Sequence, residues 1–275
     1  MSSLQSRVLV SVIGVPVLVW VVLWAPSIVM MAALAVLAGI AAYELLNCVG
    51  ISTKGWLTFP ENWMSFPTIA CAAWTVVSCY RWPEFIKVLW PLYVLATFCY
   101  AIIKVGEIKF SHITAGIFTV MVIPYSFSAF LRLEASGIHR AYLLLPFILS
   151  FACDTFAYFA GRAFGKHKLA PKVSPKKTIE GSIGGMAGNV VCGLLFAFVM
   201  DRWFGGSIGY GAMALLALVC SIVAQVGDLS FSLIKREFGI KDYGHLFLEH
   251  GGVLDRFDSV LFVTPVIEMI LSFVK

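Results

Sequence analysis

Long uninterrupted apolar segments constrain this chain more than any other feature. Nine of them are long enough, or nearly so, to cross a bilayer as helices, which takes about 20 residues each. Apolar and polar residues do not alternate within them, so a membrane β-barrel is not indicated. The sequence therefore predicts an all-α, polytopic helical membrane protein with about nine transmembrane helices. The segments cover residues 8–24, 27–46, 66–80, 86–103, 113–131, 141–160, 182–200, 209–226 and 259–274.

The composition agrees with a membrane protein. Hydrophobic residues make up 60% of the chain and charged residues only 13%, about half the charged share of a soluble domain. A chain this apolar is neither an ordinary soluble domain nor disordered. The net charge of +5 is small and concentrated in two loops, which argues against nucleic-acid binding. The seven cysteines form no CxxC pair and lie mostly in apolar segments, so we interpret them as core residues.

The basic residues are distributed unequally between the two sides of the predicted membrane. With nine crossings, 14 of the 20 Lys and Arg residues share a side with the N-terminus. Positive loops face the cytoplasm, so the charged loops within 150–182 and 225–259 are predicted to be cytoplasmic. No internal repeat is visible. We expect one integral membrane domain over 1–275, in which 1–140 is mainly scaffold and 141–275 carries the active site.

Asp154 and Glu44 are acids that lie within predicted apolar segments. Asp154 shares a helix face with Tyr158 and Gly161, at i, i+4 and i+7. An acid within a span indicates a functional site with a partner, here Arg162 or a metal, and the alternative is a structural ion pair near the interface. Glu44 also needs a partner and is assigned no role. Close helix packing is expected of several glycines, with a glycine-lined path for a lipid tail as the alternative for the last three: Gly161, Gly165, Gly184, Gly185 and Gly188.

A lysine-rich segment follows. Its two prolines predict a loop over residues 169–181. Lysines act there as point charges, and the next helix offers free N–H groups at its start, an arrangement that suits a polyphosphate. The alternative is a loop that only fixes topology or contacts anionic lipid. The polar residues of this candidate site are Ser174, Lys176, Lys177, Thr178 and Glu180.

The densest polar signal lies at residues 225–259. A continued helix would place Asp228, Ser232 and Lys235 on one face, and Asp255 and Asp258 share a face at the start of the last apolar segment. Carboxylates gathered near a membrane interface repel one another unless a cation neutralises them. Oxygen ligands without a Cys–His group favour magnesium over zinc. The alternative is a solvated loop with locally paired charges.

Taken together, these segments resemble the phosphatidate cytidylyltransferase (CDP-diacylglycerol synthase) family over the whole chain. The upstream match is Asp154, Tyr158, Gly161, Arg162 and Gly165, followed by the Ser174 to Gly181 stretch. The family's C-terminal signature is matched at Ser232, Lys235, Arg236, Lys241, Asp242, Gly244, His250, Gly251, Gly252, Asp255, Arg256 and Asp258. The chain departs from the usual Asn and Pro-Gly ahead of His-Gly-Gly, where it has His245, Leu248 and Glu249.

The resemblance implies that CTP and phosphatidic acid give CDP-diacylglycerol and pyrophosphate in the cell membrane, with the active-site loops cytoplasmic and no nucleic-acid partner. It implies Mg²⁺, and leaves a second cation and a homodimer open. The resemblance implies catalytic roles for Asp228, Lys235, Arg236 and Asp255. It implies metal ligation by Asp228, Asp255 and Asp258. Substrate binding falls on Asp154, Arg162, Ser174, Lys176, Lys177, Thr178, Glu180, Ser232, Lys241, Asp242, His250, Gly251, Gly252 and Arg256.

Two other functions remain open from the residues alone. Another CTP-dependent membrane lipid enzyme, such as a polyprenol or phytol kinase, would use the same charges but release CDP. An ion-coupled transporter would use Asp154 and Asp228 as sites within the membrane. Transporters often carry inverted repeats, and none is visible here.

Overall fold

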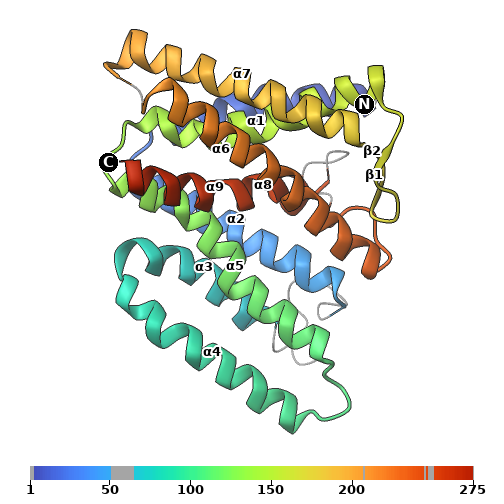
Figure 1. Ribbon diagram of the computed structural model, residues 1–275. Coiled ribbons are helices and arrows are strands. Elements are labelled where there is room, and N and C mark those ends of the chain that lie inside the picture. Colours follow the sequence, from blue (N-terminus) through green and yellow to red (C-terminus); the bar gives the residue numbers. More distant parts are fainter. Residues whose placement is uncertain (1–2, 51–64, 207, 245, 247–250, 275) are drawn as a thin grey trace. The chain divides into compact units, whose positions relative to one another are not determined.

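The computed structural model describes residues 3–50, 65–206, 208–244, 246 and 251–274 (Figure 1). These residues form nine α-helices, one 3₁₀ helix and one short β-hairpin, which confirms the all-α class. In order, the elements are α1 (Ser3–Leu23), α2 (Ser27–Cys48), α3 (Ser65–Arg81), α4 (Pro83–Ile103), α5 (Phe110–Ala135), η1 (Arg140–Leu144), α6 (Leu145–Phe164), β1 (Lys168–Ala170), β2 (Ser174–Thr178), α7 (Ile179–Phe204), α8 (Tyr210–Glu237) and α9 (Leu254–Val274).

Six of the described helical segments are long and apolar enough to cross a membrane. They are α2, α4, α5, the joined η1 and α6, α7 and α8. The chain is therefore an integral membrane protein, although nine crossings are not confirmed. The other three predicted spans coincide with helices that are shorter or more polar. The described apolar part of α1 is only Val12–Leu23, α3 has 17 residues, and α9 carries Asp258 and Glu268.

The helices group into two compact units. The first unit contains Met1–Gly137 and Glu237–Arg256, and the second contains Ile138–Arg236 and Phe257–Lys275. In the first unit, α2 packs on α3 and α5. Ala38, Ala41 and Ala42 are fully buried along α2, and such small side chains let neighbouring helices approach closely. The described residues between 238 and 256 follow α8 in the chain but group with the first unit.

In the second unit, α6 and α7 lie side by side through small residues (Figure 1). A Cβ added to Gly184 would overlap the side chain of Ala160, and one added to Gly188 would overlap Phe156. At Gly185 it would lie 2.9 Å from the carbonyl oxygen of Cys153. These glycines therefore serve the close helix packing that their spacing predicts.

The lysine-rich segment is a β-hairpin rather than an irregular loop, which corrects the sequence prediction. Strands β1 and β2 pair antiparallel, with Lys168 opposite Thr178 and Ala170 opposite Ser174. Each strand of a two-stranded sheet is an edge strand, so β2 tolerates Pro175, which has no N–H to donate. Pro171 lies in the connecting turn. The hairpin leads directly into α7 and fixes where its lysines lie.

Candidate functional site

The second unit contains a cavity of about 530 Å³ that is lined by several charged and polar residues. Its walls come from α6, the β-hairpin, the first turn of α7 and the middle of α8. The lining includes seven residues that the sequence predicted for the site: Asp154, Arg162, Ser174, Lys176, Lys177, Thr178 and Asp228. Segments separated by more than 70 residues in the chain therefore meet at one place.

Helix α6 contributes one face to the cavity, as its periodicity predicts. Asp154, Tyr158 and Gly161 all line it. Arg162 Nη1 donates to the Tyr158 hydroxyl over 3.4 Å. A Cβ on Gly161 would lie 2.9 Å from Thr178 Oγ1, so the glycine lets the hairpin approach the helix. Gly161 therefore shapes the wall of the cavity and also serves packing.

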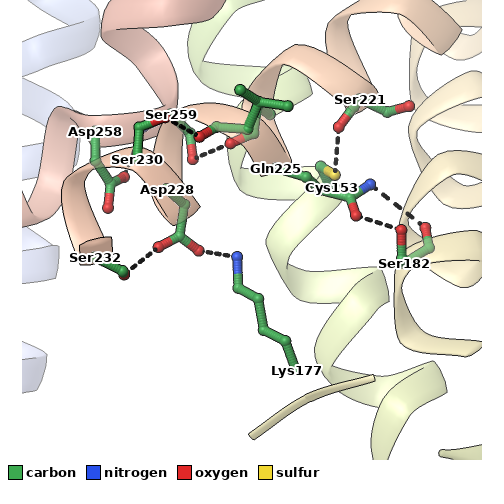
Figure 2. Close-up of polar contacts among 12 residues, drawn as sticks. Cys153, Lys177, Ser182, Ser221, Gln225, Asp228, Ser230, Ser232, Asp258 and Ser259 are labelled. Carbon is green, nitrogen blue, oxygen red and sulfur yellow. Dashed lines mark hydrogen bonds and ion pairs between the residues drawn. The ribbon is translucent and has the colours of Figure 1, made fainter. Parts of the chain in front are cut away.

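An ion pair between the hairpin and α8 forms the centre of the site. Lys177 Nζ pairs with Asp228 Oδ2, and Ser232 Oγ donates to Asp228 Oδ1 over 3.2 Å (Figure 2). Both side chains of the ion pair are mostly buried, at 25% and 21% exposure. Helix α8 is unbroken from Tyr210 to Glu237, which confirms the predicted shared face of Asp228 and Ser232.

Three carboxylates of this unit interact with one another. Asp228 repels Asp154, and Asp258 repels both of them. Figure 2 shows Asp258 on α9 near Asp228. Lys177 and Lys235 supply the opposing positive charge. The acids are nevertheless not placed as a closed metal cage, because no three His, Cys, Asp or Glu residues in the described part of the chain form a group that could hold an ion unaided.

Thr178 and Glu180 stabilise the join between the hairpin and α7. Thr178 Oγ1 caps the helix by accepting from Gly181 N over 3.1 Å. The Glu180 carboxylate accepts from the backbone N–H groups of Lys166 and His167, at 3.0 and 3.2 Å, and lies 2.6 Å from His167 Nδ1. Glu180 is therefore engaged with the segment before β1 and does not line the cavity.

Sequence reasoning missed two polar residues of the cavity wall, Ser182 and Gln225. The Ser182 hydroxyl donates to Gln225 Oε1, and Gln225 Nε2 donates back to the Ser182 carbonyl oxygen over 3.5 Å (Figure 2). Gln225 is only 9% exposed. A signal was available, because Gln225 lies three residues before Asp228 and is therefore on the same side of α8.

The remaining predicted residues of the second unit lie outside the cavity lining. Ser232 donates a hydrogen bond to Asp228, which itself lines the cavity. Lys235 interacts with Asp258. Arg236 Nε donates to the carbonyl oxygen of Val173, in the hairpin turn, over 3.3 Å. The guanidinium of Arg236 thus connects the end of α8 to the hairpin.

Gly251, Gly252 and Asp255 belong to the first unit. Asp255 Oδ2 accepts from Tyr243 N over 2.8 Å and from Gly252 N over 3.0 Å. Gly251 has φ +83°, a conformation that favours glycine. His250 lies outside the described residues. The other predicted residues of this unit are the exposed Lys241, Asp242 and Arg256.

Comparison with known proteins gives a consistent family. The model of the Cytidylyltransferase family matches residues 5–274. A phosphatidate cytidylyltransferase of Staphylococcus haemolyticus is 37% identical over 172 residues, which are 62% of this chain and 64% of the relative. The corresponding protein of Staphylococcus saprophyticus is 39% identical over 166 residues, or 59% of this chain and 61% of that one. The alignments therefore span less than two thirds of either relative.

Proposed function

The chain belongs to the cytidylyltransferase family, and on that premise we propose that it is a phosphatidate cytidylyltransferase. It would transfer the cytidylyl group of CTP to phosphatidic acid and release pyrophosphate. The observation that carries the proposal is the cavity in which Lys177, from the hairpin, meets Asp228, from α8. The names of the relatives support the choice of lipid and nucleotide.

The charges of the cavity suit a reaction between two anions. Phosphatidic acid and CTP repel each other, so positive charge has to lie where they meet. Arg162, Lys176 and Lys177 line the cavity and can neutralise phosphate oxygens. Phosphoryl transfer needs little covalent participation by the protein, because positioning and charge stabilisation supply most of the catalysis.

Magnesium fits the donor set of the second unit. Mg²⁺ keeps several waters and binds through one or two carboxylates together with substrate phosphates, so a closed protein cage is not required. Asp228 and Asp258 would hold it, and Asp154 adds negative charge beside them. When bound, the ion would neutralise the nucleotide phosphates and polarise their oxygens. Asp255, the third ligand that the resemblance implies, stays a prediction.

The chemistry requires no general base from the protein. A phosphate oxygen of phosphatidic acid is already ionised near neutral pH, and it attacks the α-phosphorus of CTP in line. The new P–O bond forms as the bond to the β-phosphate oxygen breaks, and pyrophosphate carries away the electron pair. The basic side chains orient the two phosphates and stabilise the charge on the leaving group.

The surface beside the cavity suits a lipid substrate. Tyr158, Phe159 and Ile183 are 60%, 61% and 60% exposed on α6 and α7. Large exposed apolar side chains on a membrane-crossing helix face acyl chains. A lipid headgroup could therefore reach the cavity while its chains stay in the bilayer. The excess of Lys and Arg in the neighbouring loops supports a cytoplasmic position for this face at the cell membrane.

A paired labelling experiment tests the proposed function. Purified protein is incubated with phosphatidic acid, Mg²⁺ and CTP labelled either in the cytosine ring or at the γ-phosphate. A cytidylyltransferase puts only the ring label into lipid and releases the γ-label as pyrophosphate. A CTP-dependent lipid kinase does the opposite and releases CDP. Failure of the ring label to enter lipid would refute the proposal.

The lysines of the hairpin give a further prediction. The double substitution Lys176→Arg and Lys177→Arg keeps the charge but replaces compact ammonium groups by planar guanidinium groups. We expect kcat/KM to fall by about tenfold or more, because small displacements of positioning groups are costly. Steady-state kinetics measures the effect.

The same hairpin offers the matched control. Lys168→Arg with Lys172→Arg makes the same chemical change at exposed positions that do not line the cavity, and should leave kinetics unchanged. Cysteine-accessibility labelling confirms that orientation is the same in both variants. Equal kinetics for the two pairs would leave the hairpin as a topology signal only.

A further inference from the structure

A buried acid outside the cavity holds the start of α9. Glu44 lies on α2 and is only 4% exposed. Its Oε1 accepts from Val253 N and its Oε2 from Leu254 N, each over 2.9 Å. All three residues belong to the first unit. An acid within a membrane-crossing helix is expensive and is kept where it has a specific task.

The task of this acid is to accept hydrogen bonds from N–H groups at the start of α9. The first N–H groups of a helix have no partner within it, and a side chain such as Ser, Thr, Asp or Asn usually accepts from them. Here the residue preceding the helix is Val253, which has no acceptor in its side chain. Glu44 supplies both acceptor oxygens from a position more than 200 residues away. A negative group is also favoured at this end of a helix dipole.

The surroundings are fitted to this carboxyl group. A Cβ on Gly244 would lie 2.6 Å from Glu44 Oε1, and one on Gly252 would overlap the same carboxyl group. Asp255 accepts from the N–H group of Gly252, which directly precedes Val253, and from that of Tyr243. Two acids therefore hold the backbone from Gly252 to Leu254, and each satisfies N–H groups that the other does not.

We propose that Glu44 is a positioning residue of the reaction, which holds the first turn of α9 and with it Asp255 and Arg256. The role in the reaction rests on the proposed function. The hold on the backbone does not, because it follows from the two hydrogen bonds and the burial of the carboxyl group. These two parts can be measured separately.

The test uses Glu44→Gln and compares it with Glu134→Gln. The glutamine amide has one acceptor oxygen for two N–H groups, so one of them loses its partner. We expect amide hydrogen exchange in the segment 251–256 to become about tenfold faster or more, which corresponds to the loss of a hydrogen bond to a charged group. We expect kcat to fall at least about tenfold, as for other residues that orient ligands, with a smaller change in the KM for CTP. Glu134 accepts from Ser27 in the same unit, and its variant should change neither quantity.

Two further variants distinguish a specific effect of Glu44 from a general folding defect. Glu44→Asp keeps a carboxylate and should recover part of both effects. Gly244→Ala keeps Glu44 but crowds its carboxyl group, and should reproduce the faster exchange at 251–256. If exchange there is unchanged in both Glu44→Gln and Gly244→Ala, the hold on α9 is refuted.

The remaining outcomes also decide the proposal. Faster local exchange with unchanged kcat refutes the positioning role. Faster exchange throughout the first unit, with kcat lowered only in proportion to the folded fraction, assigns Glu44 to general stability and overturns the proposal. If the wild-type protein makes no CDP-diacylglycerol, the proposed function fails, while the exchange measurement still decides whether Glu44 holds the helix.

Discussion

Replacing Asp228 with asparagine is expected to leave the protein folded and to lower kcat by about two to three orders of magnitude, the usual cost of removing a charge-stabilising group from an active site. The asparagine can still accept from Ser232 but cannot neutralise Lys177, with which Asp228 forms its ion pair. It also removes one of the three interacting carboxylates that would attract a cation.

The fold should survive this substitution for electrostatic reasons. Asp228 repels both Asp154 and Asp258, so the loss of its charge relieves two unfavourable interactions while it breaks one favourable pair. The ion pair is mostly buried, and such pairs contribute less to stability than their attraction suggests, because both charges must be desolvated.

The measurement combines kinetics with thermal unfolding in detergent. Asp201→Asn is the matched control, since Asp201 is an exposed aspartate of α7 outside the cavity lining. Asp255→Asn should also be nearly inactive if its charge serves the reaction. A turnover close to wild type in Asp228→Asn would show that this residue is not part of the active site.

Removal of divalent ions should abolish activity, and added Mg²⁺ should restore it. The residues that would meet the ion are carboxylates, which are hard oxygen ligands preferred by magnesium. All seven cysteines are free, and none of them belongs to a group of three His, Cys, Asp or Glu side chains that could hold an ion in the described part of the chain. Restoration by Mg²⁺ rather than by Zn²⁺ is therefore expected.

A binding measurement separates the metal from the chemistry. A ligand that binds only the folded state raises its stability, so Mg²⁺ with CTP should raise the melting temperature of the wild-type protein. The rise should be absent in Asp228→Asn and present in Asp201→Asn. Full activity in excess chelator, or an equal rise in both variants, would remove magnesium from the proposed mechanism.

The helical faces of the site were predictable because they depend on one segment at a time. A run of about 20 apolar residues has few stable alternatives to a helix in a bilayer. Once the helix is accepted, the period of 3.6 residues places Asp154 with Tyr158, and Asp228 with Ser232. The structure has both pairs as predicted. The matched family signature also includes Asp154, Tyr158 and Ser232.

The number of crossings could not be fixed in the same way. The borderline segments coincide with α1, α3 and α9, and length and composition leave their relation to the membrane open. The hairpin was also missed, because prolines interrupt most strands and only an edge strand accepts Pro175. Whether a strand lies at an edge depends on what pairs with it, which local sequence does not state.

The sequence by itself determined the helical membrane class, the family resemblance and most of the charged residues of the candidate site. The tertiary structure alone decided their partners: Lys177 with Asp228, Ser182 with Gln225, and Glu44 with the start of α9. The physical reason is that periodicity acts within an element, over a few residues. A hydrogen bond or an ion pair between elements depends on how helices pack, and small residues such as Gly184 and Gly188 set that packing without carrying any charge themselves.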